Sequence, residues 1–133
     1  MWKIRPDGSS ETQLTTAGGY SGYESADGKY LYYKGAGASP MWRIPVEGGT
    51  PTKVADWGGT RVFTPSKTGI YLGGGPTGTE LRFLDFVTGG IRVIADFGRH
   101  GNPNVAISSD GRWALYSRSE QSNTNLILVE NFR

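Results

Sequence analysis

The chain has 133 residues, a formal net charge of +2 and a hydrophobic content of 36%, which suits one folded domain rather than a disordered segment. It has no cysteine, so disulfides, thiolate-bound metals and thiol nucleophiles are excluded. The basic residues are scattered along the sequence, which argues against a nucleic-acid surface, and no apolar run approaches the roughly 18 residues of a membrane span. We therefore expect a single domain over residues 1–133 with neither nucleic acid nor membrane as its partner.

Short apolar and aromatic runs, each bounded by Gly, Pro, Asn or Asp, follow one another along the chain and predict β-strands. No window has the apolar period of a helix over a helical length. In chain order, twelve of the thirteen predicted strands cover residues 2–4, 12–15, 30–34, 41–46, 52–56, 61–65, 69–73, 80–87, 91–96, 104–108, 112–119 and 125–130. The sequence therefore predicts an all-β protein.

The turns between these strands have a recognisable chemistry. Asp-Gly pairs stand at 7–8, 27–28 and 110–111, and glycine supplies the positive φ angles that tight hairpin turns need. Residues 64–69 are a degenerate copy of the Ser-x-Asp-Gly turn that lacks the Asp. Hairpin turns of this kind predict that neighbouring strands pair antiparallel.

Two phrases recur at a spacing of about forty residues, which is typical of β-propeller blades. The segment 1–9 returns at 41–49 and more loosely at 81–90, where Phe83 is taken to replace the repeated Trp. A second phrase stands at 25–34, 65–74 and 108–117. We expect the chain to begin with the last two strands of one blade, to run through two complete four-stranded antiparallel blades, and to end with three strands of another. This is about three blades, or half a propeller.

These repeats resemble the TolB-type, WD-like β-propeller family over nearly the whole chain. The matching residues are Ser25, Asp27, Gly28, Tyr33, Trp42, Ile44 and Gly49, the run 12–15, and Ser108, Asp110, Gly111 and Tyr116. The segment 126–133 also resembles the C-terminal end of propeller regions in large bacterial sensor or regulatory proteins. The resemblance implies a recognition scaffold, and it does not imply a particular reaction.

Several motifs that suggest other functions are better explained by the repeat. Residues 73–78 satisfy G-x-G-x-x-G, but a strand pattern follows where a dinucleotide site needs a helix. The triplet at 96–98 repeats 56–58, and its Phe97 is expected to pack between blades. His100 is the only histidine, which is a poor basis for a metal site or a catalytic triad. We therefore expect no metal and no cofactor.

The tryptophans, which could form a stacking surface, are instead expected to pack between blades because two of them occupy equivalent positions in the repeat. They are Trp2, Trp42, Trp57 and Trp113.

Propellers bind ligands at the channel face, where the first strand of each blade begins. In this sequence the relevant segments are 16–23, 56–63 and 96–105. The arginines there could present forked donors to a carboxylate or phosphate. The predicted ligand-binding residues are Tyr20, Tyr23, Arg61, Arg99, His100, Asn102 and Asn104.

The leading interpretation is a non-enzymatic propeller module that binds a protein, a peptide or a small ligand. The alternative is a propeller-type lyase, lactonase or hydrolase, for which Asp56, Asp96 and His100 are the available candidates; a third interpretation is a fragment without a function of its own. Three structural alternatives follow from a half propeller: an open wedge, a piece of a longer chain, or a homodimer in which two copies close a ring of about six blades. We favour the homodimer. The cellular compartment is not predicted by the sequence.

Overall fold

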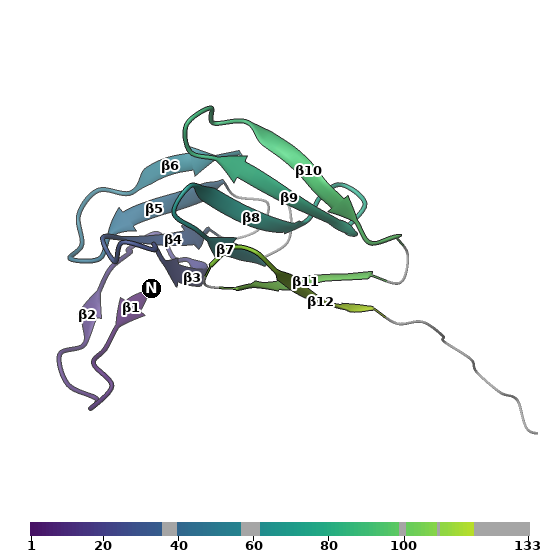
Figure 1. The fold of residues 1–133 in the computed structure, drawn as a ribbon. Helices are drawn as coiled ribbons and strands as arrows, with labels where there is room; N and C mark the ends of the chain where they lie inside the picture. Colours follow the sequence, from purple (N-terminus) through teal and green to yellow (C-terminus); the bar gives the residue numbers. More distant parts are fainter. Residues whose placement is uncertain (36–39, 57–61, 99–100, 109, 119–133) are drawn as a thin grey trace, which may run out of the picture.

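The computed structural model describes residues 1–35, 40–56, 62–98, 101–108 and 110–118, with the side chains of 101–104 and 117–118 outside the described part. These residues form twelve β-strands and no α-helix (Figure 1). Nowhere in this part of the chain is there a helix long and apolar enough to cross a membrane. All strand pairs are antiparallel, so the predicted all-β class and pairing are confirmed.

The strands form two four-stranded sheets and two hairpins, and within each the strand order follows the chain. The first sheet contains β3 (Tyr20–Glu24), β4 (Tyr30–Lys34), β5 (Met41–Pro45) and β6 (Thr52–Ala55). The second sheet contains β7 (Phe63–Pro65), β8 (Gly69–Gly74), β9 (Glu80–Asp85) and β10 (Ile91–Asp96). The leading hairpin is β1 (Trp2–Lys3) with β2 (Thr12–Gln13), and the trailing hairpin is β11 (Gly101–Ile107) with β12 (Ala114–Arg118). The strand predicted at 125–130 lies outside the described residues.

The second sheet repeats the strand register of the first. Leu31 of β4 faces Ile44 of β5, and Ile70 of β8 faces Leu84 of β9 in the same way. Position 44 therefore corresponds to 84, and position 43 to Phe83. This corrects the sequence alignment: Arg82, not Phe83, occupies the place of Trp42, because register is set by cross-strand pairing rather than by similarity of side chains.

The two hairpins repeat halves of the first sheet. Trp2 pairs with Gln13 as Trp42 pairs with Lys53, so the leading hairpin has the register of β5 and β6. In the trailing hairpin Ala106 pairs with Leu115, which matches the pairing of Tyr23 with Tyr32 in β3 and β4 when the Ser-x-Asp-Gly turns are superimposed. The predicted division of the chain into late strands, two complete units and early strands is thus seen among the described residues.

The Ser-x-Asp-Gly turns have the same hydrogen bonds in both copies. Ser25 N–H donates to the Tyr30 carbonyl at 2.7 Å, and the Ser25 hydroxyl donates to Asp27 Oδ1 at 2.6 Å while accepting from Tyr30 N–H at 2.9 Å. Ser108, Asp110 and Trp113 form the same set. Glycine follows each Asp at a φ of about 70° (70° at Gly28 and 71° at Gly111), as the sequence predicts for these turns.

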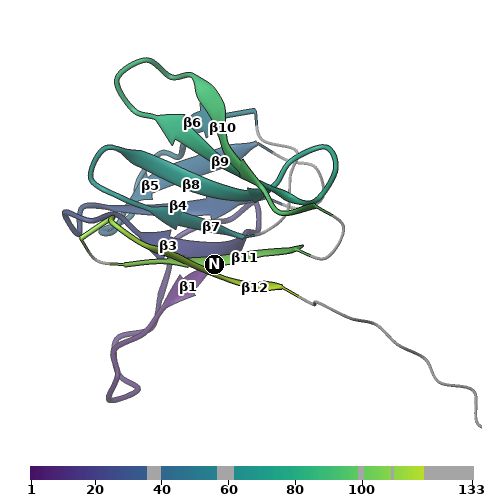
Figure 2. The same cartoon turned by 45° about the vertical axis from the view of Figure 1, so that its right-hand side comes forward.

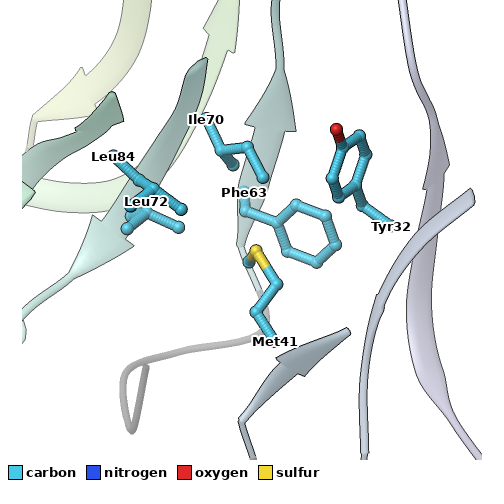
Figure 3. Packing of buried hydrophobic residues seen from close by; sticks show 6 residues of the cluster. All are labelled: Tyr32, Met41, Phe63, Ile70, Leu72 and Leu84. Atoms are coloured by element: carbon cyan, nitrogen blue, oxygen red, sulfur yellow. The ribbon is translucent and has the colours of Figure 1, made fainter. Parts of the chain in front are cut away.

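The apolar core lies between the two four-stranded sheets (Figure 3). Its buried members are Tyr32, Met41, Phe63, Ile70, Leu72 and Leu84. Burial of each apolar side chain stabilises the fold by about 1.5–3 kcal/mol. The core thus joins the two sheets into one body, and the strands around it are fixed in position.

The first strands of successive units lie side by side. β3 contacts β7, and β11 contacts β7, β8 and β9. In Figures 1 and 2 the later strands of both four-stranded sheets lie progressively farther from this line of contact. The chain therefore arranges three consecutive antiparallel units around one set of neighbouring first strands.

Two sequence interpretations of aromatic residues have different outcomes. Phe97 stacks on Tyr116 of β12 with ring centroids 4.1 Å apart, which confirms that it packs between units. Trp2 and Trp113, by contrast, are 61% and 68% exposed, so they do not pack between the units of a single chain. Both lie on two-stranded hairpins, which do not provide the sheet face that a large ring needs for cover. Trp57 lies outside the described residues.

The structure also decides two predictions about chain segments. Residues 73–78 contain the end of strand β8 and most of the turn that leads to strand β9, so the helix that a dinucleotide site requires does not follow the glycines. The strand predicted over 80–87 ends at Asp85, because Asp85 Oδ1 accepts hydrogen bonds from the N–H groups of Val87 and Thr88 and turns the chain.

Candidate functional site

The predicted ligand-binding residues are only partly within the described structure. Arg61, Arg99 and His100 lie outside it. Asn102 and Asn104 belong by their backbone to strand β11 and not to a loop, and their side chains are outside the described part. Tyr20 and Tyr23 are described, and both lie on β3. The common placement of the seven residues therefore stays a prediction, since Tyr20 and Tyr23 are the two whose side chains the structure describes.

Tyr20 and Tyr23 occupy different environments on β3. Tyr23 packs edge-on against Phe63 with ring centroids 4.8 Å apart, so it serves the core as well as the surface. Tyr20 lies across the strand pair from Lys34, whose side chain is fully buried. A bulge separates the two tyrosines, and Ser21 within it has a φ of 51°, a conformation that is uncommon for residues other than glycine.

The glycines before and within this bulge are explained by packing. A Cβ at Gly19 would lie 2.7 Å from the Met1 sulfur, and a Cβ at Gly22 would overlap the Met1 methyl group. The Met1 side chain thus occupies the space that side chains at these positions would need. The glycines at 19 and 22 therefore allow the first residue of the chain to pack against β3.

A groove that the sequence did not suggest lies between the two four-stranded sheets. It consists of two adjoining hollows of about 290 and 370 Å³, a size within the range of small-ligand sites. Tyr32, Arg43 and Phe86 line both hollows. The other lining residues are Lys53, Val54, Leu84, Asp85 and Gly89 in one, and Ser25, Ala26, Asp27, Tyr30, Ser66 and Lys67 in the other. We call this feature the intersheet groove.

The intersheet groove opens at the end of the sheets opposite to the predicted channel segments. β3 runs from Tyr20 to Glu24 and is followed by the turn at 25–29 that lines the groove. Neighbouring turns at this end are tied by backbone hydrogen bonds, with Val46 N–H donating to the Lys29 carbonyl and Phe86 N–H to the Thr68 carbonyl, both at 3.0 Å. These bonds hold the turns at the edge of the groove in position.

Arg43 is the central polar group of the intersheet groove. Its guanidinium carbon lies 4.8 Å from the centroid of the Tyr30 ring, a cation–π distance. The guanidinium also donates a hydrogen bond to the Tyr32 hydroxyl: burial raises the pKa of Tyr32, and this bond opposes the increase. Phe86 stacks on Tyr32 with ring centroids 5.8 Å apart. The two tyrosines thus hold Arg43 from one side, and the Phe86 ring extends the apolar wall.

The carboxylates at the groove are committed to their own turns. Asp27 accepts hydrogen bonds from the Ser25 hydroxyl and the Lys29 N–H, and Asp85 accepts them from the Thr88 and Val87 N–H groups. These bonds lower the pKa of both carboxyl groups. None of the ion pairs between described side chains includes Arg43. The groove therefore contains a partly buried guanidinium that is held by aromatic rings and not by an acid.

Metal binding has no support in the described part of the chain, where no group of three His, Asp or Glu side chains converges. The groove has no direct signal in the sequence, because Arg43, Tyr32 and Phe86 come from separate strands and turns. Comparisons with protein-family models, with curated proteins and with solved structures find no match to this chain. The functional interpretation therefore depends on the sequence patterns and on the geometry described above.

Proposed function

We propose that this chain is a non-enzymatic β-propeller-type recognition module, as the resemblance to TolB-type repeats implies. The observation that carries the proposal is the contact of β3 and β11 with β7, which brings the first strands of three consecutive units together. In a propeller the blades surround a central channel, and the first strands are the ones that line it. The segments that lead into these strands would then form its binding face, with Tyr20 on the first of them.

A recognition role is favoured over catalysis because the two described carboxylates named as catalytic candidates already make structural bonds. Asp56 pairs with Lys53, with 3.0 Å between Oδ2 and Nζ. Asp96 accepts hydrogen bonds from the Gly98 N–H at 2.9 Å and the Thr79 hydroxyl at 2.7 Å. A general acid or base needs a carboxylate that is directed at a substrate, and these two are directed at their own turns.

Binding to an immobilised peptide library, followed by an activity screen with lyase, lactone and glycoside substrates, tests the recognition role. We expect peptide binding that Tyr20→Ala weakens and that Val87→Ala, a change at a 93% exposed residue, leaves unchanged. Hydrolysis or elimination that is lost in Asp96→Asn and His100→Ala would instead establish the enzyme alternative. Equal binding by both surface variants would contradict the assignment of the channel face.

The same proposal includes self-association through the two hairpins. The leading hairpin has the register of β5 and β6, and the trailing hairpin has that of β3 and β4. Placed together, they would supply the strands of one further four-stranded sheet. Exposed apolar side chains lie on or beside these strands, as expected of a surface that a partner covers: Trp2, Ile4, Trp113, Leu115 and Tyr116.

We propose that β1 of one copy lies beside β12 of a second copy, with two-fold symmetry making two such joints. Sedimentation equilibrium and native mass spectrometry test this assembly. A particle of twice the 14.4 kDa chain mass is expected at micromolar concentration. A monomer throughout the concentration series would contradict the proposed dimer. The alternative would then be an open arrangement in which the strand predicted at 125–130 pairs with β12.

A further inference from the structure

The intersheet groove contains Arg43, whose two counterparts in the described strands are an apolar ring and a paired lysine. In the second sheet the corresponding residue is Phe83, and its ring lies over Gly69, which occupies the place of Tyr30. In the leading hairpin the corresponding residue is Lys3, whose ammonium donates to the Val46 carbonyl at 2.7 Å and to Glu47 at 3.3 Å. The fold therefore accepts an apolar ring or a paired cation at this position.

Arg43 differs from both of these counterparts. It is partly buried, it is held by the Tyr30 ring and the Tyr32 hydroxyl, and no described carboxylate pairs with it. One acceptor, the Tyr32 oxygen, uses only part of the five N–H donors that a guanidinium carries. Arg43 itself lines both hollows of the groove.

The surroundings of Arg43 add charge and an apolar surface. Lys53 and Lys67 line the two hollows. Lys53 is paired with Asp56, whereas none of the ion pairs between described side chains includes Lys67. The carboxylates Asp27 and Asp85 are bonded to their own turns. The Phe86 ring is stacked on Tyr32 and is 39% exposed. A ligand with an oxyanion at one end could reach Arg43 while its flat apolar body lies on Phe86.

We infer that the intersheet groove binds a small organic oxyanion, a carboxylate or a phosphate monoester carried on an aromatic or apolar body. The guanidinium of Arg43 would hold two oxygens of the anion by parallel hydrogen bonds, the geometry in which arginine excels. The ring of Phe86 would cover the apolar body. This inference does not depend on the propeller assembly, because both walls of the groove belong to the described sheets of a single chain.

The test uses titration calorimetry and amide chemical shifts of the full chain with four probes: benzoate, phenyl phosphate, inorganic phosphate and benzyl alcohol. We expect saturable binding of benzoate, phenyl phosphate or both, with shifts at β5 and at residues 85–89. Inorganic phosphate, which has no apolar body, and benzyl alcohol, which has no charge, should bind more weakly. The tighter of the two acidic probes identifies the carboxylate or the phosphate as the natural group.

Variants assign the binding to Arg43. Arg43→Gln should weaken the acidic probes by at least about tenfold, since a hydrogen bond to a charged group contributes roughly 1.5–3 kcal/mol. The matched control is Arg92→Gln, because Arg92 also lies over a ring, that of Phe83 at 5.4 Å, and does not line the groove; it should bind as the unchanged chain does. Arg43→Lys should give an intermediate loss, because it keeps the charge without the fork.

A further variant covers the case in which Arg43→Gln does not fold. Arg43→Met keeps an unbranched aliphatic stem beside the Tyr30 ring and removes the guanidinium, so it should keep the thermal transition of the parent chain and lose the acidic probes. The inference is overturned if no acidic probe binds saturably, if benzyl alcohol binds as tightly as benzoate, or if the Arg43 and Arg92 variants bind alike.

Discussion

Gly69 of β8 lies so close to the carbonyl oxygen of Leu84 on β9 that no side chain fits between them. The turn before Gly69 is two residues shorter than its counterparts, since Ser66 bonds to Gly69 where Ser25 bonds to Tyr30. The Phe83 ring then fills the place above Gly69. The shorter turn and the glycine at position 69 therefore occur together, and the Phe83 ring packs in the space that they leave.

Gly69→Ala should destabilise the fold by about 3 kcal/mol, because the added methyl group meets backbone and a packed ring that cannot move aside. Gly22→Ala is the matched control: its methyl group would meet the ends of the Met1 and Leu31 side chains and no backbone atom, so a loss of about 1 kcal/mol or less is expected. Urea unfolding followed by tryptophan fluorescence measures both. Equal losses would contradict the close approach at Gly69.

Phe63→Ala should cost about 4 kcal/mol of unfolding free energy, because Phe63 is buried in the core between the sheets and also supports Tyr23. Phe86→Ala should cost less than about 2 kcal/mol, since Phe86 is partly exposed at the groove. Chemical denaturation compares the two variants. A larger loss for Phe86 would mean that the groove, and not the Phe63 cluster, holds the sheets together.

Acid should weaken the fold through the turn aspartates. Hydrogen bonds from the Ser25 hydroxyl and the Lys29 N–H lower the pKa of Asp27 below its ordinary 3.8, and Ser108 and Arg112 do the same for Asp110. Because these pKa values are lower in the folded state, the stability that they contribute is present above pH 3.8 and is lost as the pH falls below it.

The measurement is the melting temperature between about pH 5 and pH 2. The double variant Asp27→Asn, Asp110→Asn should melt lower than the parent chain at pH 5 and show a smaller decrease on acidification. Glu11→Gln, which also removes an exposed negative charge, serves as the control and should follow the parent. A parent-like acid profile in the aspartate variant would show that these turns do not set the acid response.

The proposed joint between copies predicts a specific disulfide, and the chain has no cysteine to interfere. If β1 stands beside β12 as β5 stands beside β4, Lys3 faces Leu115, because their counterparts Arg43 and Tyr32 face each other. Lys3→Cys with Leu115→Cys should therefore give a covalent dimer under mild oxidation, seen on a non-reducing gel.

The control pairs Lys3→Cys with Ala114→Cys, in which a shift of one residue turns the second side chain to the opposite face of the sheet. It should remain monomeric on the gel. Equal dimer yields in the two pairs would indicate random collision, and no dimer in either pair would contradict the joint.

Strand positions and turns were predictable from the sequence because their signals are local. The pairs Asp27-Gly28 and Asp110-Gly111 indicate hairpin turns, because their hydrogen bonds and backbone angles involve only nearby residues. Alternating apolar residues indicate the strands between the turns. The register between paired strands is harder to predict from the sequence. The aromatic character of Phe83 suggests that it corresponds to Trp42. The pairing of Ile70 with Leu84 instead places Phe83 opposite Tyr71, so Phe83 corresponds to Arg43 of the first sheet.

The intersheet groove could not be foreseen for a related reason. Arg43 reads in sequence as the polar member of a strand, and nothing near it indicates that Tyr30 will hold it or that Phe86 will approach from the other sheet. The predicted channel residues show a related effect. Tyr23 is predicted as a ligand-binding residue, but its ring also packs against Phe63 in the core. Contacts between units determine both outcomes, and sequence periodicity carries no information about them.

The order of strands within the two sheets also affects how the chain can fold. Every pairing inside a four-stranded sheet joins strands that are adjacent in sequence, so each unit can form by successive hairpin closures over short loops, a route that favours rapid folding. The contacts of β3, β7 and β11 join residues much farther apart and would come last. Folding would then be limited by docking of preformed units, and substitutions at Phe63 should slow that step more than substitutions in the hairpin turns.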